Sequence, residues 1–311
     1  MFYDSHLHKK NKEIGGFLVG LEGKPCFDGT LNNKQVLALE DDNYTAFYYV
    51  KNNEIKAIIP VIGGDDAERL LPFLDYDAIR NNPKILLGYS DGTVLHLAFL
   101  HAGVRSVYGP AVMAGGFAEN GEMFEYFRNS VKKTLFSTDI IGKIEPNMGG
   151  WTDEELPWRD SRNQLIKRKL KKSTGYKVLQ GQKKVQGHLF GGCIEVLEML
   201  KGTSVWPKPE FFDNALLFLE TSEEAPSSDY VVRVLRNYAA MGILARINGI
   251  IVGRGANLPE NEQDRYDFAF MQVIQRECHL DIPVMTQMDF GHTDPMFLLP
   301  YGAQANIDPK E

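Results

Sequence analysis

The stretch KILLGYSDGTVLHLAFL, residues 84–100, constrains the fold more than any other part of the chain. It begins with an apolar run typical of a buried strand, turns at GYSDG (residues 88–92), and continues with an apolar run of helical length. A strand–turn–helix elbow of this form lifts its central side chain, here Ser90, above the edge of a sheet. The motif alone is equally compatible with Ser90 as the N-cap of the next helix.

Strand-like and helix-like segments alternate around this elbow, which predicts a parallel sheet with helices on both faces. In the first half the predicted strands are KAIIPVI, ILL and SVYGPAVM, and the predicted helices are AERLLPFLDYDAIRNNPK, residues 92–101 and EMFEYFRNSVKKTLF. In the second half the predicted strands are NALLFLE, NGIIVG and IPVMTQMDF, and the predicted helices are residues 228–246 and 262–278.

A chain of 311 residues is too long for the commonest single-core domain, so two domains are expected. Around residues 140–175 the sequence becomes polar and rich in Pro and Gly, without periodicity. We therefore expect an α/β protein: an N-terminal parallel-sheet domain with the elbow (1–140), a linker with a loop that reaches the site (141–175), and a C-terminal α/β domain with a mixed or β-rich core (176–311).

Charge and cysteine usage exclude several classes of partner. The net charge is −7 and the pI about 5.6, so no basic surplus exists to bind a nucleic-acid polymer. The one basic cluster, KRKLKK at 167–172, is interpreted as a solvated surface. No run of 18 apolar residues predicts a membrane span, and no signal peptide is recognisable. The three cysteines are isolated, which fits a reducing cytoplasm and argues against a zinc site.

A serine raised on an elbow can act as a nucleophile if a base and an orienting carboxylate accompany it. Of seven histidines, His292 stands out, because DFGHTDPMFLLP places it in a Gly- and Pro-rich turn after a strand. The others read as solvated or packing residues: His6, His8, His96, His101, His188 and His279.

The residues alone leave several candidates for the orienting carboxylate. Glu220 ends the strand-like run NALLFLE and is the first candidate, while Asp289 and Asp294 remain open and Asp91 is a weaker one. An oxyanion hole requires backbone donors near the nucleophile. We expect these to be the N–H groups of Asp91 and of Gly64, which ends the preceding strand.

In their order along the chain, several segments resemble the LD-carboxypeptidase family of serine peptidases (S66), which includes the microcin C immunity peptidases. The resemblance runs from about residue 56 to residue 308 and rests on IGGDDAERLLPFLDYDAIRNNPKILLGYSDGT, YGPAV, VQGHLFGGCIEVLEMLKGT, LLFLE, NGIIVGR and DFGHTDPMFLLPYGAQANID. It implies a triad of Ser90, Glu220 and His292, an oxyanion hole from Gly64 and Asp91, a site between two domains, a homodimer, and no metal or cofactor.

The resemblance also implies two alternative substrates. One branch of the family cleaves aminoacyl-nucleotide conjugates, and the other removes the terminal D-alanine from a muramoyl tetrapeptide. The segment WTDEELPW resembles the nucleobase-stacking loop of the immunity-like branch, with Trp158 as the stacking residue, so we favour that branch. Asp65 and Trp158 are the expected substrate contacts. The substrate is thus a small peptide, a muropeptide or a peptidyl-nucleotide.

The chain departs from the family pattern at a few places. Residues 1–55 match poorly, which predicts a missing first strand and one incomplete edge of the site. Cys193 stands where relatives usually carry Asn, and Thr221 where Asp is common. A member that only binds its ligand is therefore a second hypothesis. An amidotransferase-like or Rossmann interpretation is disfavoured, because the elbow lacks a cysteine and no G-x-G-x-x-G follows the first strand.

Overall fold

The computed structural model describes residues 55–60, 62–112, 119, 122–157, 160–259 and 262–310. The predictions for residues 1–54 and for Trp158 lie outside these ranges. Within them, no helix is both long and apolar enough to cross a membrane.

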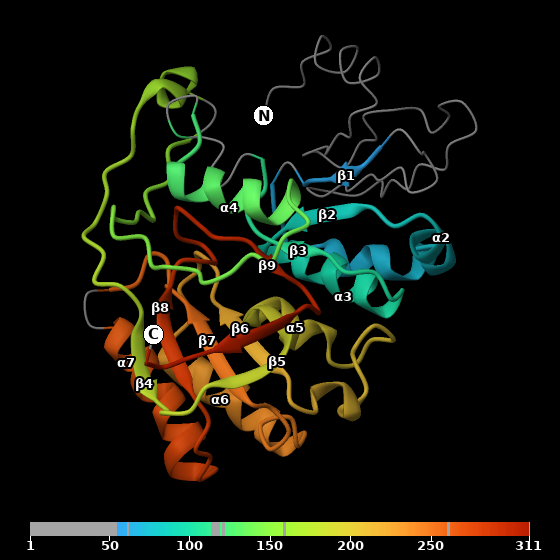
Figure 1. The fold of residues 1–311 in the computed structure, drawn as a ribbon, viewed down its shortest axis with the longest axis vertical. Helices are drawn as coiled ribbons and strands as arrows, with labels where there is room; N and C mark the ends of the chain where they lie inside the picture. The colour runs from blue at the N-terminus through green and yellow to red at the C-terminus, as the bar shows by residue number, and fades with distance from the viewer. Residues whose placement is uncertain are drawn as a thin grey trace.

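Two sheets form the frame of the molecule (Figure 1). The first has the order β1-β2-β3-β9 and contains β1 (Ala57–Ile58), β2 (Ile85–Gly88), β3 (Val107–Tyr108) and β9 (Leu299–Pro300). Strands β1, β2 and β3 are parallel, whereas β9 is antiparallel to β3 and comes from the far end of the chain. The C-terminal part of the chain therefore returns to complete the sheet that carries the elbow.

The second sheet has the order β10-β5-β6-β7-β8-β4. Its strands are β4 (Lys177–Gln180), β5 (Val185–Cys193), β6 (Leu216–Glu220), β7 (Gly249–Gly253), β8 (Val284–Met288) and β10 (Gln304–Ile307). The four central strands are parallel and both edge strands are antiparallel, which makes this a mixed sheet. Every residue of β6 and β7 is buried, as expected for strands covered on both faces.

The described residues form α-helices in both halves of the molecule. They are α2 (Tyr76–Asn81), α3 (Thr93–His101), α4 (Glu125–Leu135), α5 (Ile194–Leu200), α6 (Ser228–Ala240) and α7 (Glu262–Met271). Helix α3, which follows the elbow, is buried from residue 93 to residue 99 and packs against α5 and β5. One hydrophobic core therefore includes residues of both sheets, and the elbow lies where they meet.

The segment between α4 and β4 runs along one side of the molecule and joins the two halves (Figure 1). Thr152 pairs through its backbone with Asp294, and the Arg168 side chain makes ion pairs with Glu119 at 2.9 Å and with Asp294 at 2.8 Å. The interpretation of KRKLKK as a solvated surface is therefore wrong for Arg168, whose side chain is only 10% exposed. Two carboxylates on distant segments attract it inward.

Other differences from the predicted elements have local causes. The helix predicted over AERLLPFLDYDAIRNNPK is two helices, the 3-10 helix η1 (Ala67–Phe73) and α2, because Pro72 interrupts the pattern and Asp75 caps α2 by accepting the Ala78 N–H at 2.8 Å. The helix predicted over 262–278 continues from α7 into a π-helical turn, Gln272–Glu277. The remaining short 3-10 helices are η2 (Ser90–Gly92), η4 (Ser161–Leu165) and η5 (Pro209–Phe212).

Candidate active site

Ser90 occupies a strained position at the end of β2. Its φ angle is +57°, in the left-handed region that L-residues other than Gly, Asn and Asp seldom adopt. The N-cap of η2 is Tyr89 and that of α3 is Gly92, with no side-chain cap at either helix. The alternative that Ser90 caps the following helix is therefore wrong, and strain of this kind is typical of a functional elbow.

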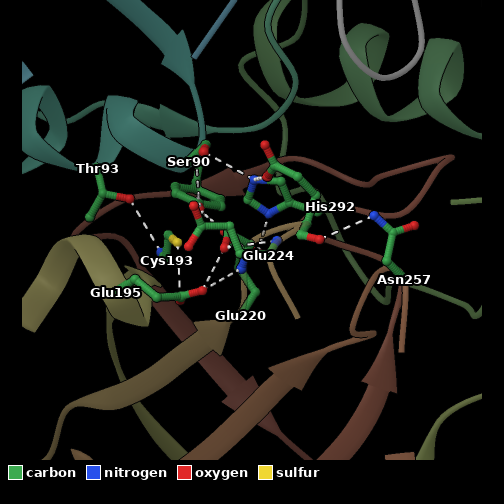
Figure 2. A network of polar contacts seen from close by, with 11 residues as sticks. Ser90, Thr93, Cys193, Glu195, Glu220, Glu224, Asn257 and His292 are labelled. Carbon is green, nitrogen blue, oxygen red and sulfur yellow. Dashed lines mark hydrogen bonds and ion pairs between the residues drawn. The ribbon is translucent and has the colours of Figure 1, made fainter. Parts of the chain in front are cut away.

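The Ser90 hydroxyl, the His292 imidazole and the Glu220 carboxylate form a continuous chain of polar contacts (Figure 2). His292 Nε2 lies 3.0 Å from Ser90 Oγ, and His292 Nδ1 lies 2.7 Å from Glu220 Oε2. The serine comes from the first sheet, the glutamate from the end of β6, and the histidine from the loop after β8. The structure thus brings together the three residues singled out in the sequence.

Gly291 makes room for this arrangement. Its φ angle is +96°, and a Cβ atom added there would lie 2.8 Å from both Cβ and Oε2 of Glu220. Any side chain at this position would push the carboxylate away from the imidazole of His292. The glycine of the FGH sequence is therefore required by close approach as well as by its backbone angle.

Tyr108, at the end of β3, connects the nucleophile with the carboxylate. Its hydroxyl donates to Glu220 Oε1 at 2.5 Å and accepts the Ser90 backbone N–H at 3.3 Å. Both oxygens of the buried Glu220 carboxylate are thereby satisfied, one by His292 and one by Tyr108. The sequence analysis did not identify Tyr108, because only its position in YGPAV, next to the elbow strand, could have pointed to it.

The electrostatics favour a proton on His292. Burial lowers the pKa of His292, yet the charge and hydrogen bond of Glu220 outweigh burial and raise that pKa to about 9. Burial also raises the pKa of Glu220, while His292 and the Tyr108 hydroxyl act to lower it. Two further carboxylates, Glu223 and Glu195, raise the pKa of His292 as well. The site stabilises an imidazolium, the state that forms when serine transfers its proton.

The backbone next to the nucleophile includes a glycine that the sequence analysis did not choose. A Cβ atom added to Gly63 would lie 3.3 Å from Ser90 Cβ and 3.4 Å from Ser90 Oγ, so its backbone directly faces the serine. The next residues, Gly64 and Asp65, are exposed. We retain as predictions that Gly64 and Asp91 are the oxyanion donors and that Asp65 contacts the substrate.

Asp91 holds the loop that carries these glycines. Its carboxylate is fully buried and accepts the Ala67 backbone N–H at 3.1 and 3.3 Å, at the start of η1. Burial raises the pKa of Asp91 to about 7, against the lowering effect of the Ala67 hydrogen bond. The side chain points toward η1, which agrees with its being a weak candidate to orient His292.

The two other open candidates for the orienting carboxylate have different partners. Asp289 pairs with Arg254 at 2.9 Å and accepts the Asn147 N–H at 2.7 Å, and Asp294 pairs with Arg168. Both stabilise the loop that contains His292 without accepting from its imidazole.

Three of the other described histidines have partners away from the site, and one of them, His101, lies against the ring of Tyr76. His96 is a buried packing residue that contacts Ser106 and the Gly88 carbonyl, and His188 lies against the ring of Phe211.

A second layer of polar residues supports the site from α5. Glu195 Oε1 accepts from the backbone N–H and the hydroxyl of Ser222, at 2.9 and 2.6 Å, and Glu195 Oε2 lies 3.3 Å from the Cys193 thiol. The Cys193 N–H donates to the Thr93 hydroxyl, which links β5 to the first turn of α3. These contacts fix the loop after β6, which carries Glu223.

Two family models match this chain. The model of the LD-carboxypeptidase N-terminal domain matches residues 45–109, and that of the LD-carboxypeptidase C-terminal domain matches residues 186–307. Among curated proteins, the microcin C7 self-immunity protein MccF of Escherichia coli is 32% identical over 83% of this chain and 73% of its own length. A probable murein peptide carboxypeptidase of Bacillus subtilis is 25% identical over 90% of this chain and 78% of its own length.

Solved structures show the same fold. An MccF-like protein from Streptococcus pneumoniae in complex with AMP superposes with a TM-score of 0.74 at 28% identity, covering 84% of this chain and 78% of that one. MccF in complex with aspartyl sulfamoyl adenosine gives a TM-score of 0.66 at 29% identity, covering 83% of this chain and 75% of that one. The two-domain α/β architecture is therefore shared.

Proposed function

The chain belongs to the LD-carboxypeptidase family, and from this premise we propose that it is a serine-type carboxypeptidase whose triad is Ser90, His292 and Glu220. The observation that carries the proposal is the hydrogen-bonded chain from the strained Ser90 through His292 to the buried Glu220. Nucleophile, base and orienting carboxylate lie within the distances that acyl transfer requires.

The geometry supports a two-stage hydrolysis. Ser90 Oγ attacks the scissile carbonyl carbon while His292 Nε2 accepts its proton, and Glu220 stabilises the resulting imidazolium. The imidazolium then protonates the leaving nitrogen, the C–N bond breaks, and an acyl-serine remains. Water deprotonated by His292 attacks the ester and restores the Ser90 hydroxyl. Gly64 and Asp91 backbone N–H groups are proposed to bind the oxyanion, and the position of Gly63 against Ser90 places that loop beside the nucleophile.

We favour an aminoacyl-nucleotide conjugate as the substrate. This is supported by the likeness to MccF, which is solved in complex with aspartyl sulfamoyl adenosine and with glutamyl sulfamoyl guanosine. A muramoyl-tetrapeptide L,D-carboxypeptidase is the second candidate, and the match to the murein peptide carboxypeptidase of Bacillus subtilis favours it. Both substrates contain an amide or amide-like acyl–nitrogen bond that the same three residues can cleave.

Exposed apolar side chains are consistent with the expected homodimer. In the segment that follows α4, Phe136 is 81%, Ile140 95% and Leu165 75% exposed. Light scattering of the purified chain would measure the dimer directly. A cytoplasmic location stays a prediction from the isolated cysteines.

Hydrolysis of two substrates tests the proposed function. Wild type and Ser90→Ala are incubated with an aminoacyl sulfamoyl adenosine and with a muramoyl L,D-tetrapeptide, and the products are identified by mass spectrometry. Cleavage of the nucleotide analogue that is lost in Ser90→Ala supports the favoured function, and cleavage of the tetrapeptide alone supports the second. Folded wild type that binds a substrate and cleaves neither would support a protein that only binds its ligand.

A further inference from the structure

Glu223 contacts the reactive nitrogen of His292 although it belongs to no part of the triad. Its Oε2 atom lies 3.1 Å from His292 Nε2, almost the same distance as Ser90 Oγ at 3.0 Å. Glu223 comes three residues after Glu220, in the loop that follows β6. His292 is therefore flanked by a carboxylate at each ring nitrogen, Glu220 at Nδ1 and Glu223 at Nε2.

These two contacts affect the protonation state of the His292 imidazole. The contact with Glu220 is a hydrogen bond, and because a carboxylate cannot donate one, Nδ1 carries the proton; Nε2 is hydrogen-bonded to Ser90 Oγ and lies at ion-pair distance from Glu223. The negative charge of Glu223 close to Nε2 favours the imidazolium form of His292, and an imidazolium cannot accept the proton of Ser90. Neutralising the charge of Glu223 therefore favours the neutral imidazole that can activate Ser90.

The backbone of Glu223 is fixed whereas its side chain is accessible. The Asn257 side-chain amide donates to the Glu223 carbonyl at 3.1 Å, and the preceding Ser222 is anchored to Glu195. The Glu223 side chain is 49% exposed, compared with 6% for His292 and 0% for Glu220. A group arriving from solvent can therefore reach the Glu223 carboxylate without disturbing the buried pair.

The charged groups nearest to His292 are predominantly acidic. Those that raise its pKa are Glu220, Glu223 and Glu195, from β6, the loop after it and α5. Asp294, on the loop of His292, and Tyr89, on the elbow with its ring centroid 4.8 Å from that of His292, complete the surroundings.

Two arginines that contact residues close in sequence to His292 are paired with carboxylates other than Glu223. Arg168 pairs with Glu119 and Asp294, and Arg254 pairs with Asp289. Among the described residues, the ion pair of Glu223 is the one with His292, so its accessible carboxylate offers negative charge beside the nucleophile.

We propose that Glu223 recognises the charge of the substrate: it binds an ammonium group carried close to the scissile carbonyl, and the neutralisation of its charge favours the neutral His292 that accepts the proton of Ser90. The ammonium group is either the free α-amino group of the acyl residue, which is bonded to the carbon next to the carbonyl, or a basic side chain of the same residue long enough to fold back toward it. This inference rests on the proposed serine hydrolysis and adds a specificity-determining residue to it. It also predicts that aspartyl and glutamyl groups, which MccF binds in its solved complexes, are less favourable acyl groups here.

Two substrate series measure the effect of charge. In both series the residue that supplies the scissile carbonyl is varied. The first series is four sulfamoyl adenosines that carry lysyl, alanyl, N-acetylalanyl or aspartyl groups. The second is four muramoyl tetrapeptides in which this residue is lysine, norleucine, N-acetyllysine or glutamate. The scaffold that wild type cleaves in a Ser90-dependent manner is used for kinetics. Wild type is expected to prefer ammonium-bearing substrates in kcat/KM by about tenfold to a hundredfold, the range of one charge-assisted hydrogen bond. Comparison of alanyl with N-acetylalanyl, and of lysyl with alanyl, distinguishes the two sources of the ammonium group.

Glu223→Gln is the informative variant, because it keeps the shape and removes the charge. Glu224→Gln is the matched control: Glu224 is the next residue and is also exposed, and its backbone N–H donates to Ser222 Oγ. We expect Glu223→Gln to abolish the preference and Glu224→Gln to retain it.

The pH profile of kcat/KM gives an independent readout. His292 must be neutral to accept a proton, and its pKa of about 9 in the free protein makes activity rise with pH toward that value. Loss of the Glu223 charge lowers this pKa, so the acidic limb of the profile should move to lower pH in Glu223→Gln. Glu224→Gln should leave the limb in place.

The outcomes separate the two proposals. If turnover is independent of Ser90 on every substrate, the proposed function is wrong. If turnover depends on Ser90 but Glu223→Gln retains both the substrate preference and the pH profile, only the role of Glu223 is refuted. An equal loss of preference in Glu224→Gln would also refute it, since diffuse negative charge would then explain the selectivity.

Discussion

Replacing Tyr108 with phenylalanine removes one hydroxyl that contacts two members of the proposed triad. That hydroxyl donates to Glu220 Oε1 at 2.5 Å and accepts the Ser90 N–H at 3.3 Å, inside a site where Glu220 is 1% exposed. Without it, one oxygen of a buried carboxylate loses its donor, and water cannot easily replace the lost bond. The substitution changes neither the size of the ring nor the hydrophobic contacts of Tyr108.

The magnitude follows from the type of bond. A hydrogen bond to a charged group contributes about 1.5–3 kcal/mol, and an unsatisfied buried acceptor costs a similar amount. We expect the free energy of unfolding to fall by about 2–3 kcal/mol. If the bond to Glu220 is also lost in the transition state, kcat/KM should fall by about tenfold to a hundredfold, since 1.4 kcal/mol corresponds to a factor of ten.

Urea unfolding and steady-state kinetics on the cleaved substrate measure both effects. Tyr238→Phe is the control, because Tyr238 is equally buried but its hydroxyl has no hydrogen-bond partner among the described residues. It should change neither stability nor turnover appreciably. Tyr108→Phe with wild-type kcat/KM would refute the idea that this hydroxyl positions the triad carboxylate.

Three further substitutions test other parts of the structure. Gly63→Ala places a methyl group 3.3 Å from Ser90 Cβ, so kcat/KM should fall at least about tenfold with little change in melting temperature, and wild-type turnover would contradict the placement of that loop. Arg168→Met leaves the Asp294 carboxylate buried without its partner, so the free energy of unfolding measured by chemical denaturation should fall by about 3–5 kcal/mol. A decrease below about 1 kcal/mol would show that the pair is solvated. Burial raises the pKa of Asp91 from 3.8 to about 7, so the folded state binds more protons than the unfolded state. The contribution of Asp91 to the free energy of unfolding is fully present below pH 3.8 and is lost as the pH rises through about 7. The loss is at most about 1.4 kcal/mol per pH unit. Unfolding of Asp91→Asn between pH 4 and pH 7 should show a flatter dependence, and an unchanged slope would be contrary to this account.

The features that the sequence predicted best are those encoded by local patterns. The elbow at residues 88–92 combines an apolar strand, a turn and an apolar helix within 17 residues, and the family's segments appear in order around it. Glu220 and His292 both end or follow strongly apolar strands, so their placement at the edge of the sheet could be predicted. The contact of His292 with Ser90 spans 202 residues of sequence and that of His292 with Glu220 spans 72, and the prediction of both rested on the resemblance.

Features that depend on long-range contacts were missed. Arg168 lies in a basic cluster that reads as solvated, yet carboxylates 49 and 126 residues away bury it. Strand β5, the longest strand described, was absent from the predicted elements because three glycines interrupt its pattern. An added Cβ at Gly191 would lie 1.6 Å from the Phe218 carbonyl, so glycine there reflects the close approach of β6. Glu223 gave no signal, since an acidic residue in a loop is usually a solvated one.

Covalent trapping of Ser90 tests the central claim most directly. The intact protein is treated with a fluorophosphonate, which forms a bond only with a serine whose proton a neighbouring base removes, and the adduct is located by peptide mass spectrometry. Wild type is expected to carry one adduct, on Ser90, with labelling absent in Ser90→Ala and strongly slowed in His292→Ala and Glu220→Gln. Folded wild type that remains unlabelled, or that is labelled at another serine with equal rate in all variants, would contradict a triad built from these residues.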